Sequence, residues 1–209
     1  MNSALTQHLP RQCLLDESPQ IVPTLTCPSC TTHLSTSQPP QVLTTYHNEG
    51  GIQSNLDIYH LVKEEAYLCT NPSARPARAY LTMCAEGDVS GIVELLNAIS
   101  EDLDEGDLSP AQLLRYQDPL DGEKTGLHVA LEKSQAEAVW LLLWLASELP
   151  TAAFPDEMVR AAGVMGAGRE MVGGGSDIRE FRDEQGRSAE DVAGSMGDVW
   201  AGLLGAGVL

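Results

Sequence analysis

The feature that most constrains this chain is a pattern of two apolar helical stretches joined by a short break, which recurs along its second half. In residues 125–146, TGLHVALEKSQAEAVWLLLWLA, apolar residues at helical spacing flank a polar break at Ser134. The same layout is present in residues 80–99 and 183–204. A pair of short helices cannot bury its apolar face alone. The pattern therefore predicts an all-α fold in which successive pairs stack as a short solenoid.

The spacing of the breaks indicates the length of the repeating unit. They fall at Gly87, Ser134, Gly166 and Gly197, with separations of 47, 32 and 31 residues. Two of these intervals match a unit of about 33 residues made of a turn and two helices. The sequence thus predicts three to four repeats within residues 77–209.

Two stretches interrupt the repeats. Residues 97–116 form an acidic insertion that lengthens the first interval, and a Ser-Pro pair at residues 109–110 is placed to start a short extra helix. Residues 166–176 form a glycine-rich loop. Loops that bind nucleotides follow a buried strand, whereas this loop follows a helical stretch, so we expect no cofactor there.

The repeats resemble the ankyrin repeat family. From Thr125, TGLHVALEKSQAEAVWLLL follows the family's Thr-Pro-Leu-His-x-Ala-Ala helix pair without a gap, and DEQGRSAEDVA from Asp183 follows its Asp-x-x-Gly-Arg-Thr opening. Gly126 stands where the family has Pro. Residues 189–191 replace Pro-Leu-His with a more polar set, as the exposed face of a terminal repeat requires.

The resemblance implies structural roles for several residues. His128 would hydrogen-bond near the turn and help to fix Thr125, while Gly186 and Ser188 would open the last helix. A lone histidine without a second ligand in reach is more often structural than catalytic. Cys84 occupies a position that is normally Ala, so we expect a small buried apolar residue. No pair of nucleophile and base can be assembled from these residues, and we expect no catalytic site.

A narrower resemblance is to the ankyrin segment that precedes the catalytic domain of fungal arginine methyltransferases. It rests on AEGDVSGIVELL, QDPLDGEKTGLHVAL and the terminal GLLGAGVL. The printed sequence stops where that catalytic domain would begin, so the likeness does not imply methyl transfer. It leaves an alternative function open, that of a stand-alone or truncated relative of the methyltransferase accessory region.

The charge of the chain points to its class of partner. It has 30 acidic residues against 12 Lys and Arg, a formal charge of -18. Residues 76–209 account for 24 of the acidic and 9 of the basic residues, a balance of -15. Such a surface repels phosphate backbones, so we expect no nucleic acid. A basic protein partner, attracted by complementary charge, is the favoured expectation.

Five residues are candidates for binding this partner. Asp121 and Glu123 in a turn, with Glu132 and Lys133 on the following helix, line the side on which ankyrin arrays usually bind; a charge run there can equally be a solvated face. Trp140 takes a position that is usually a solvated Lys. Either it anchors a partner, or the acidic insertion, the N-terminal helix or the glycine loop covers it.

The first part of the chain differs in composition. In Ser18–Thr45, 19 of 28 residues are Ser, Thr, Pro or Gln. The segment therefore has too few apolar side chains to offset the entropy of ordering the backbone. We therefore expect residues 1–50 to form a disordered tail. Residues 55–69 have the apolar spacing of an amphipathic helix. The prediction for residues 51–76 is this helix followed by a linker.

The tail also contains potential zinc ligands, Cys27, Cys30 and His33 in CPSCTTH. A structural zinc site needs four ligands, and no second pair follows at the usual spacing, although His47 and Cys69 are stray candidates. A tail with two reduced thiols is the favoured interpretation, and the zinc site stays open as an alternative.

The remaining expectations concern the surroundings of the protein. The longest apolar run, residues 139–146, is far shorter than the ~20 residues of a membrane helix, and the first 30 residues lack a secretion signal. We expect a monomer in the cytoplasm or nucleus, with no membrane partner and reduced cysteines.

Overall fold

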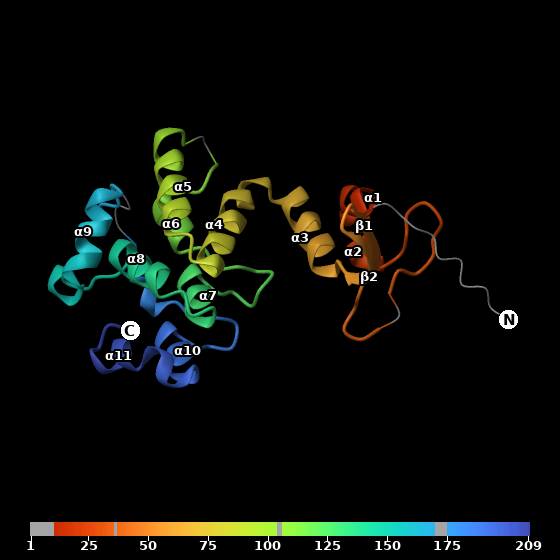
Figure 1. Ribbon diagram of the computed structural model, residues 1–209. Helices are drawn as coiled ribbons and strands as arrows, with labels where there is room; N and C mark the ends of the chain where they lie inside the picture. The colour runs from red at the N-terminus through yellow and green to blue at the C-terminus, as the bar shows by residue number, and fades with distance from the viewer. Residues whose placement is uncertain (1–10, 36, 104–105, 170–174) are drawn as a thin grey trace. The chain divides into compact units, whose positions relative to one another are not determined.

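The computed structural model has two compact units, Met1–Pro72 and Ser73–Leu209 (Figure 1). The described residues are 11–35, 37–103, 106–169 and 175–209. These residues are mostly helical, with eleven α-helices and one two-stranded sheet. The expected all-α class is thus correct for most of the described chain, and a small antiparallel sheet must be added to it.

The first unit combines short helices with a β-hairpin. Its elements are α1 (Arg11–Asp16), α2 (Ser18–Thr24), β1 (Leu43–Asn48), β2 (Gly51–Asp57) and α3 (Tyr59–Thr70). The strands pair antiparallel, from Leu43 opposite Asp57 to Asn48 opposite Gly51. A small core joins residues that are distant in sequence: Leu14, Ile21, Val42, Ile58 and Val62.

The structure places regular elements within residues 1–50, the segment for which the sequence predicts a disordered tail. Residues 11–24 are largely helical and residues 43–57 contain the hairpin, while residues 1–10 lie outside the described part. The physical reason is local. The carboxylate of Asp57 accepts hydrogen bonds from the backbone N–H groups of Val42 and Tyr59, each at 3.0 Å. It thereby joins the residue before β1 to the residues that follow β2 at the open end of the hairpin. Composition averaged over the segment hides such specific bonds.

The second unit is built from helices. They are α4 (Arg75–Glu86), α5 (Val89–Glu101), α6 (Pro110–Leu114), α7 (Gly126–Glu132), α8 (Ala136–Ala146), α9 (Asp156–Val164), α10 (Ala189–Ser195) and α11 (Ala201–Gly205). Short 3-10 helices among the described residues include Thr151–Ala153, Ile178–Glu180 and Gly197–Trp200, and a further one, Pro72–Ala74, spans the boundary between the two units in the sequence. Figure 1 shows α4, α7 and α10 following one another through the unit, each with a partner helix, α5, α8 or α11.

The breaks predicted within the helix pairs are left-handed turns. Gly87, Ser134 and Gly197 have φ angles of 75°, 58° and 68° and separate the two members of each pair. Gly166, with φ 71°, ends α9, but no second α-helix follows it before α10 in the described residues. The predicted copy around Gly166 is therefore not a helix pair there. A left-handed residue closes a helix wherever its last carbonyls need new donors, whether or not a partner helix follows.

Neighbouring pairs are joined by equivalent hydrogen bonds. Gln135, at the start of α8, donates from Nε2 to the Ala85 carbonyl near the end of α4, at 3.0 Å. Trp200, before α11, donates from Nε1 to the Leu131 carbonyl near the end of α7, at 3.2 Å. Carbonyls at a helix C-terminus have no partner within their own helix. The start of the second helix in one pair therefore supplies a donor to the C-terminal end of the first helix in the pair before it. These bonds hold neighbouring pairs in their order.

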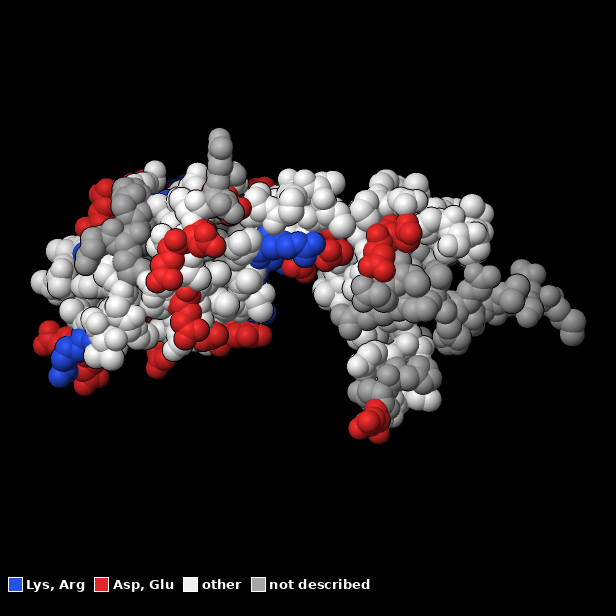
Figure 2. All heavy atoms as spheres, turned by 90° about the horizontal axis from the view of Figure 1, so that it is seen from above, with Lys and Arg blue, Asp and Glu red and all other residues white. Residues whose placement is uncertain are grey.

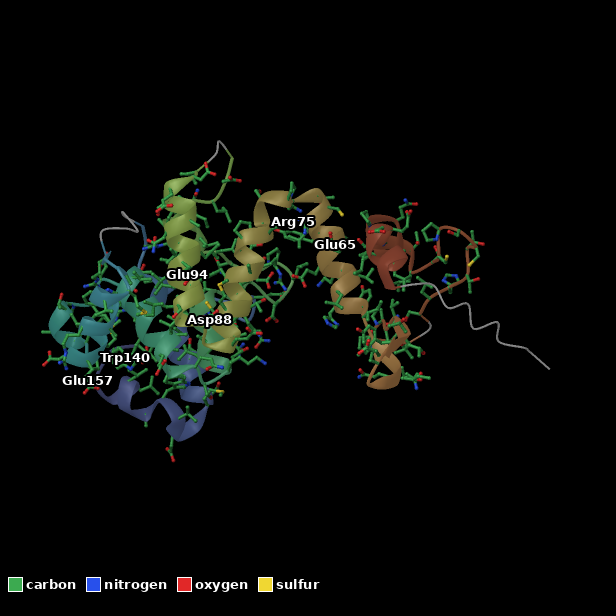
Figure 3. The ribbon with its side chains drawn as sticks, turned by 45° about the horizontal axis from the view of Figure 1, so that its top comes forward. Glu65, Arg75, Asp88, Glu94, Trp140 and Glu157 are labelled. Carbon is green, nitrogen blue, oxygen red and sulfur yellow. The ribbon has the colours of Figure 1, made fainter. Side chains whose placement is uncertain are left out.

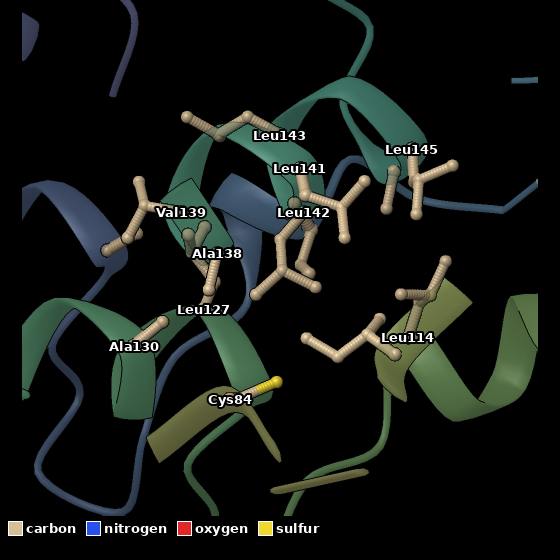
Figure 4. Packing of buried hydrophobic residues seen from close by; sticks show 14 of the residues in the cluster. Cys84, Leu114, Leu127, Ala130, Ala138, Val139, Leu141, Leu142, Leu143 and Leu145 are labelled. Atoms are coloured by element: carbon tan, nitrogen blue, oxygen red, sulfur yellow. The ribbon is translucent and has the colours of Figure 1, made fainter. Parts of the chain in front are cut away.

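The core of the unit lies around α8, which is apolar on nearly every side (Figure 4). Leu141, Leu142, Leu143 and Leu145 are all buried because α5, α6, α7 and α9 pack around the helix. The short helix α6 contributes the buried Leu114 to this core. Its start at residues 109–110 confirms the prediction from the Ser-Pro pair, with the Ser109 side chain forming a capping box.

Close packing accounts for the glycine at position 126. A Cβ atom on Gly126 would lie 2.3 Å from the Tyr80 hydroxyl oxygen and 2.8 Å from the Cys84 sulfur. Both side chains are fully buried and cannot move aside easily. Any larger residue at this position would force the first helices of two pairs, α4 and α7, apart.

We predict that Gly126→Ala lowers the free energy of unfolding by about 1 to 3 kcal/mol through overpacking. Gly194→Ala is the matched control, because Gly194 also lies in a helix but its added Cβ would meet no atom within 4 Å. That change should raise stability by about 0.5 to 1 kcal/mol. Urea unfolding of both variants measures the difference, and equal stability would contradict the close approach of Tyr80 and Cys84.

Candidate functional site

The turn that precedes α7 is organised by a buried carboxylate, that of Asp118. The backbone N–H of Asp118 donates to the Lys124 carbonyl at 2.9 Å, and Oδ1 of Asp118 accepts from the backbone N–H of Leu120 at 2.9 Å. Its Oδ2 is paired with the Arg78 guanidinium of α4. The turn is thereby tied to the preceding helix pair.

The turn that precedes α10 has the same arrangement around Asp183. Its Oδ1 accepts from the backbone N–H groups of Gln185 and Arg187, and Arg187 Nε donates to Oδ2 at 2.7 Å. Burial acts to raise the pKa of Asp183, but the hydrogen bonds from Arg187 outweigh it, and the pKa lies below its ordinary value. Asp183 is therefore held as a carboxylate inside the turn.

These two turns, Asp118–Lys124 and Asp183–Arg187, form a surface that we call the turn face. The Glu184 backbone N–H donates to the Gly122 carbonyl at 2.8 Å, so the turns are in direct contact. Glu132 lies between them and accepts from Lys124 Nζ at 2.8 Å and from Arg187 at 3.3 Å. The sequence predicts that Glu132 binds a partner, but in the structure its carboxylate forms ion pairs with Lys124 and Arg187 of the same chain.

The other predicted residues of this face remain exposed. Asp121, Glu123 and Lys133 are all exposed, and Asp121 is 3.2 Å from Lys124 Nζ. A surface ion pair of this kind contributes little and is screened by salt. Asp121 and Glu123 therefore offer carboxylates to solvent at the tip of the first turn.

His128 is a buried link between the two turns. Its Nδ1 accepts from the Thr125 backbone N–H at 3.3 Å and lies 2.8 Å from the Thr125 hydroxyl oxygen. Its Nε2 lies 3.1 Å from the Arg187 carbonyl, which assigns the ring proton to Nε2 as the donor. Burial lowers the pKa of His128, while the Arg187 carbonyl and the charges of Asp183 and Glu132 act to raise it. Both ring nitrogens serve the fold.

The remaining predicted structural residues lie in the second turn. Gly186 adopts φ 77°, a conformation that only Gly enters at little cost. Ser188 caps α10: its backbone and hydroxyl contact Asp191 Oδ2 at 2.9 Å, and its Oγ accepts from the Asp191 backbone N–H at 3.3 Å. Together they set the direction in which α10 begins.

Trp140 lies apart from the turn face. It is partly buried on α8, and its ring meets Phe154 edge-on, with ring centroids 5.9 Å apart. Phe154 belongs to the loop before α9, so this loop covers part of the Trp140 ring; it is none of the three segments that the sequence offers as a cover. The start of the glycine loop instead contacts Trp144, whose Nε1 donates to the Ala167 carbonyl at 2.8 Å.

An open groove of about 490 Å³ extends from Trp140 between α5, α8 and α9. We call it the Trp140 groove. Its apolar lining includes Val89, Trp140, Leu141, Met158, Ala162 and Met165. None of the predicted turn-face residues lines it. Figure 3 shows Trp140 beside Glu157, with Asp88 and Glu94 on or next to α5.

The helices around this groove are acidic. Among the residues of α5, α8 and α9, five are acidic and one, Arg160, is basic; the acidic ones are Glu94, Glu101, Glu137, Asp156 and Glu157. Glu137 and Glu157 line the groove and are exposed. On the face drawn in Figure 2, acidic side chains are more abundant than basic ones over the helical second unit.

The N-terminal zinc candidates form a compact loop. Thr26 and His33 pair as an isolated bridge, and the Cys27 N–H donates to the Thr32 carbonyl at 2.9 Å. A hydrogen bond with Thr32 lowers the pKa of Cys30. In the part of the chain that the structure describes, no group of three or more His, Cys, Asp or Glu is placed to hold a metal ion.

Cys84 is enclosed by the core. Burial raises the pKa of its thiol to about 12, so it stays protonated at neutral pH. Burial also raises the pKa of its neighbour Tyr80, whose hydroxyl donates to the Leu114 carbonyl at 3.5 Å. A thiol in this state is a poor nucleophile.

Comparison of the chain with protein-family models, curated proteins and solved structures gives no match. In the described ranges, no helix has both the length and the apolar character that crossing a membrane requires. The assignment of function therefore rests on the geometry of the chain itself.

The Trp140 groove was not predicted from the sequence. The sequence marks Trp140 as an apolar residue at a position that is usually solvated, but no local pattern indicates that Met158 and Met165 lie near it. The signal that could have separated α9 from the repeats is Phe154-Pro155, where a proline starts a new helix after an apolar residue.

We predict that the stability of the second unit falls from about pH 7 to about pH 5 through His128. The pKa of His128 is depressed in the folded state, so the unfolded chain binds the proton first near its ordinary pKa, about 6.5, and stability is lost as pH decreases through this window. His128→Gln should remove this part of the pH dependence and, like His128→Ala, lower stability by about 1 to 3 kcal/mol at pH 7. Urea unfolding at several pH values tests this, and an equal pH slope in wild type and His128→Gln would refute it.

Proposed function

We propose that this chain is a non-catalytic protein-interaction module of the ankyrin type, whose acidic second unit binds a basic protein partner. The observation that carries the proposal is the repeated turn. Asp118 and Asp183 occupy corresponding places, and the helices after them begin at corresponding caps, Thr125 and Ser188. A fold that repeats its turns presents a row of loops suited to binding another protein.

The spacing of the helix pairs fits the ankyrin type only when two insertions are allowed for. The left-handed residues Gly87 and Ser134 are 47 positions apart, and Ser134 and Gly197 are 63 positions apart. Each interval exceeds the period of about 33 residues, and each contains an added helix, α6 in the first and α9 in the second. We infer three repeats with two insertions.

The state of the reactive side chains supports a non-catalytic role. Both ring nitrogens of His128 are engaged by Thr125 and Arg187 inside the fold. The Cys84 thiol is buried with its pKa raised to about 12. A general base must reach a substrate proton, and a nucleophile must be accessible and activated. Neither residue meets these conditions.

The charge distribution supports a basic partner. Residues 76–209 hold 24 acidic and 9 basic residues. Asp118, Glu132 and Asp183 are paired within the chain, while Asp121 and Glu123 stay exposed at the tip of a turn. Exposed charges of one sign steer an oppositely charged protein toward the surface and speed its association.

We predict that proteins captured from an extract by the purified chain are enriched in basic proteins, and that capture weakens as salt rises from about 50 to about 300 mM. Asp121→Lys with Glu123→Lys should lower the association rate of a captured partner and flatten its salt dependence. Surface plasmon resonance measures both, with Lys133→Glu as a control of opposite charge change. A captured set without basic enrichment, or binding indifferent to salt, would overturn the proposed function.

A further inference from the structure

The Trp140 groove is lined by residues of three helices, α5, α8 and α9. Residues Val89 and Ser90 line it from the start of α5, Trp140 and Leu141 from α8, and Met158 from α9. A second open groove, of about 510 Å³, lies against the same Trp140 and is lined by Phe154, Trp200 and Leu203 among others. The indole is common to both, so the apolar surface continues on each side of it.

The lining is suited to receiving side chains from another protein. Met158 is partly buried at the groove, and unbranched thioether side chains adapt their shape to an incoming apolar group. Trp140 already packs edge-on with Phe154, with ring centroids 5.9 Å apart, so little of its freedom is lost on binding. Aromatic residues in such positions are the usual anchors of interfaces.

Charge decides what can occupy the groove. Glu137 and Glu157 line it from α8 and α9, and both are exposed. Arg160, the basic residue among these helices, donates from Nε to the Asp156 backbone carbonyl at 3.2 Å. An apolar floor with carboxylates on two sides complements a segment that has an apolar stripe flanked by Lys or Arg, and it repels phosphate groups.

We propose that the Trp140 groove binds a basic amphipathic helix of the protein partner, with an apolar side chain against Trp140 and Met158 and basic side chains beside Glu137 and Glu157. This inference rests on the proposed function and adds a specific site to it. Helices bind helical grooves through apolar residues at spacings of three and four, which places charged neighbours on both rims.

The test uses labelled helical peptides of about 18 residues. One has Leu at spacings of three and four with Lys elsewhere, a second replaces Lys by Glu, and a third replaces Leu by Ser. Fluorescence anisotropy with the full chain should show binding of the first peptide only. Trp140→Ala should weaken it about tenfold or more, whereas Trp140→Phe should keep most of the affinity. If Trp140→Ala does not fold, Met158→Lys replaces it and should weaken binding similarly.

Two double reversals with the same charge change separate the surfaces. Glu137→Lys with Glu157→Lys should weaken the peptide strongly, and Asp121→Lys with Glu123→Lys should leave it nearly unchanged. Equal weakening by both would show general attraction to an acidic protein and would overturn the groove. Weakening of peptide binding by the Asp121→Lys, Glu123→Lys reversal alone would also overturn the groove as the binding site, while the proposed function would still stand. Failure of the Lys–Leu peptide to bind at all would refute the groove, whereas the proposed function fails only with the capture experiment.

Discussion

The buried carboxylates of Asp118 and Asp183 are the constraint on which the second unit depends. A charge removed from water without a partner costs several kcal/mol, so each turn must close around its aspartate. Asp118 is satisfied by its own turn and by Arg78 of the preceding helix pair, and Asp183 by Arg187. With both turns fixed, His128 can bridge from Thr125 to the Arg187 carbonyl. These few polar contacts join the two turns to each other and the first turn to the preceding helix pair.

The same network determines which charges are left for binding. It uses the acidic side chains closest to the helices, Asp118, Glu132 and Asp183, and leaves Asp121 and Glu123 at the tip. Five further acidic residues lie on the helices around the Trp140 groove. Net charge alone therefore predicts the class of partner and the speed of encounter, but not the place of contact.

Part of this structure was accessible from the sequence. Helix pairs follow from apolar periodicity, and the breaks at Gly87 and Gly197 follow from the left-handed conformation that glycine allows. The hairpin in residues 43–57 escaped prediction because the Asp57 carboxylate fixes it, not its composition. The Trp140 groove could not be predicted because it depends on where the loop containing Phe154 packs against α8. This is a tertiary contact that no local sequence pattern encodes.

Trp140 lies at an open groove because α9 and the loop before it pack beside α8. In a regular stack the second helix of a pair meets only its neighbours, and a tryptophan on its outer side would lie in water. The loop before α9 brings Phe154 against one edge of the indole and sets Met158 beside the groove, so the ring is held but not enclosed. An aromatic ring that is ordered before binding loses little entropy when a partner covers it. Deleting α9 and the loop before it would therefore remove one wall of the groove and the contact that orders Trp140, while the Asp118 and Asp183 turns would still form.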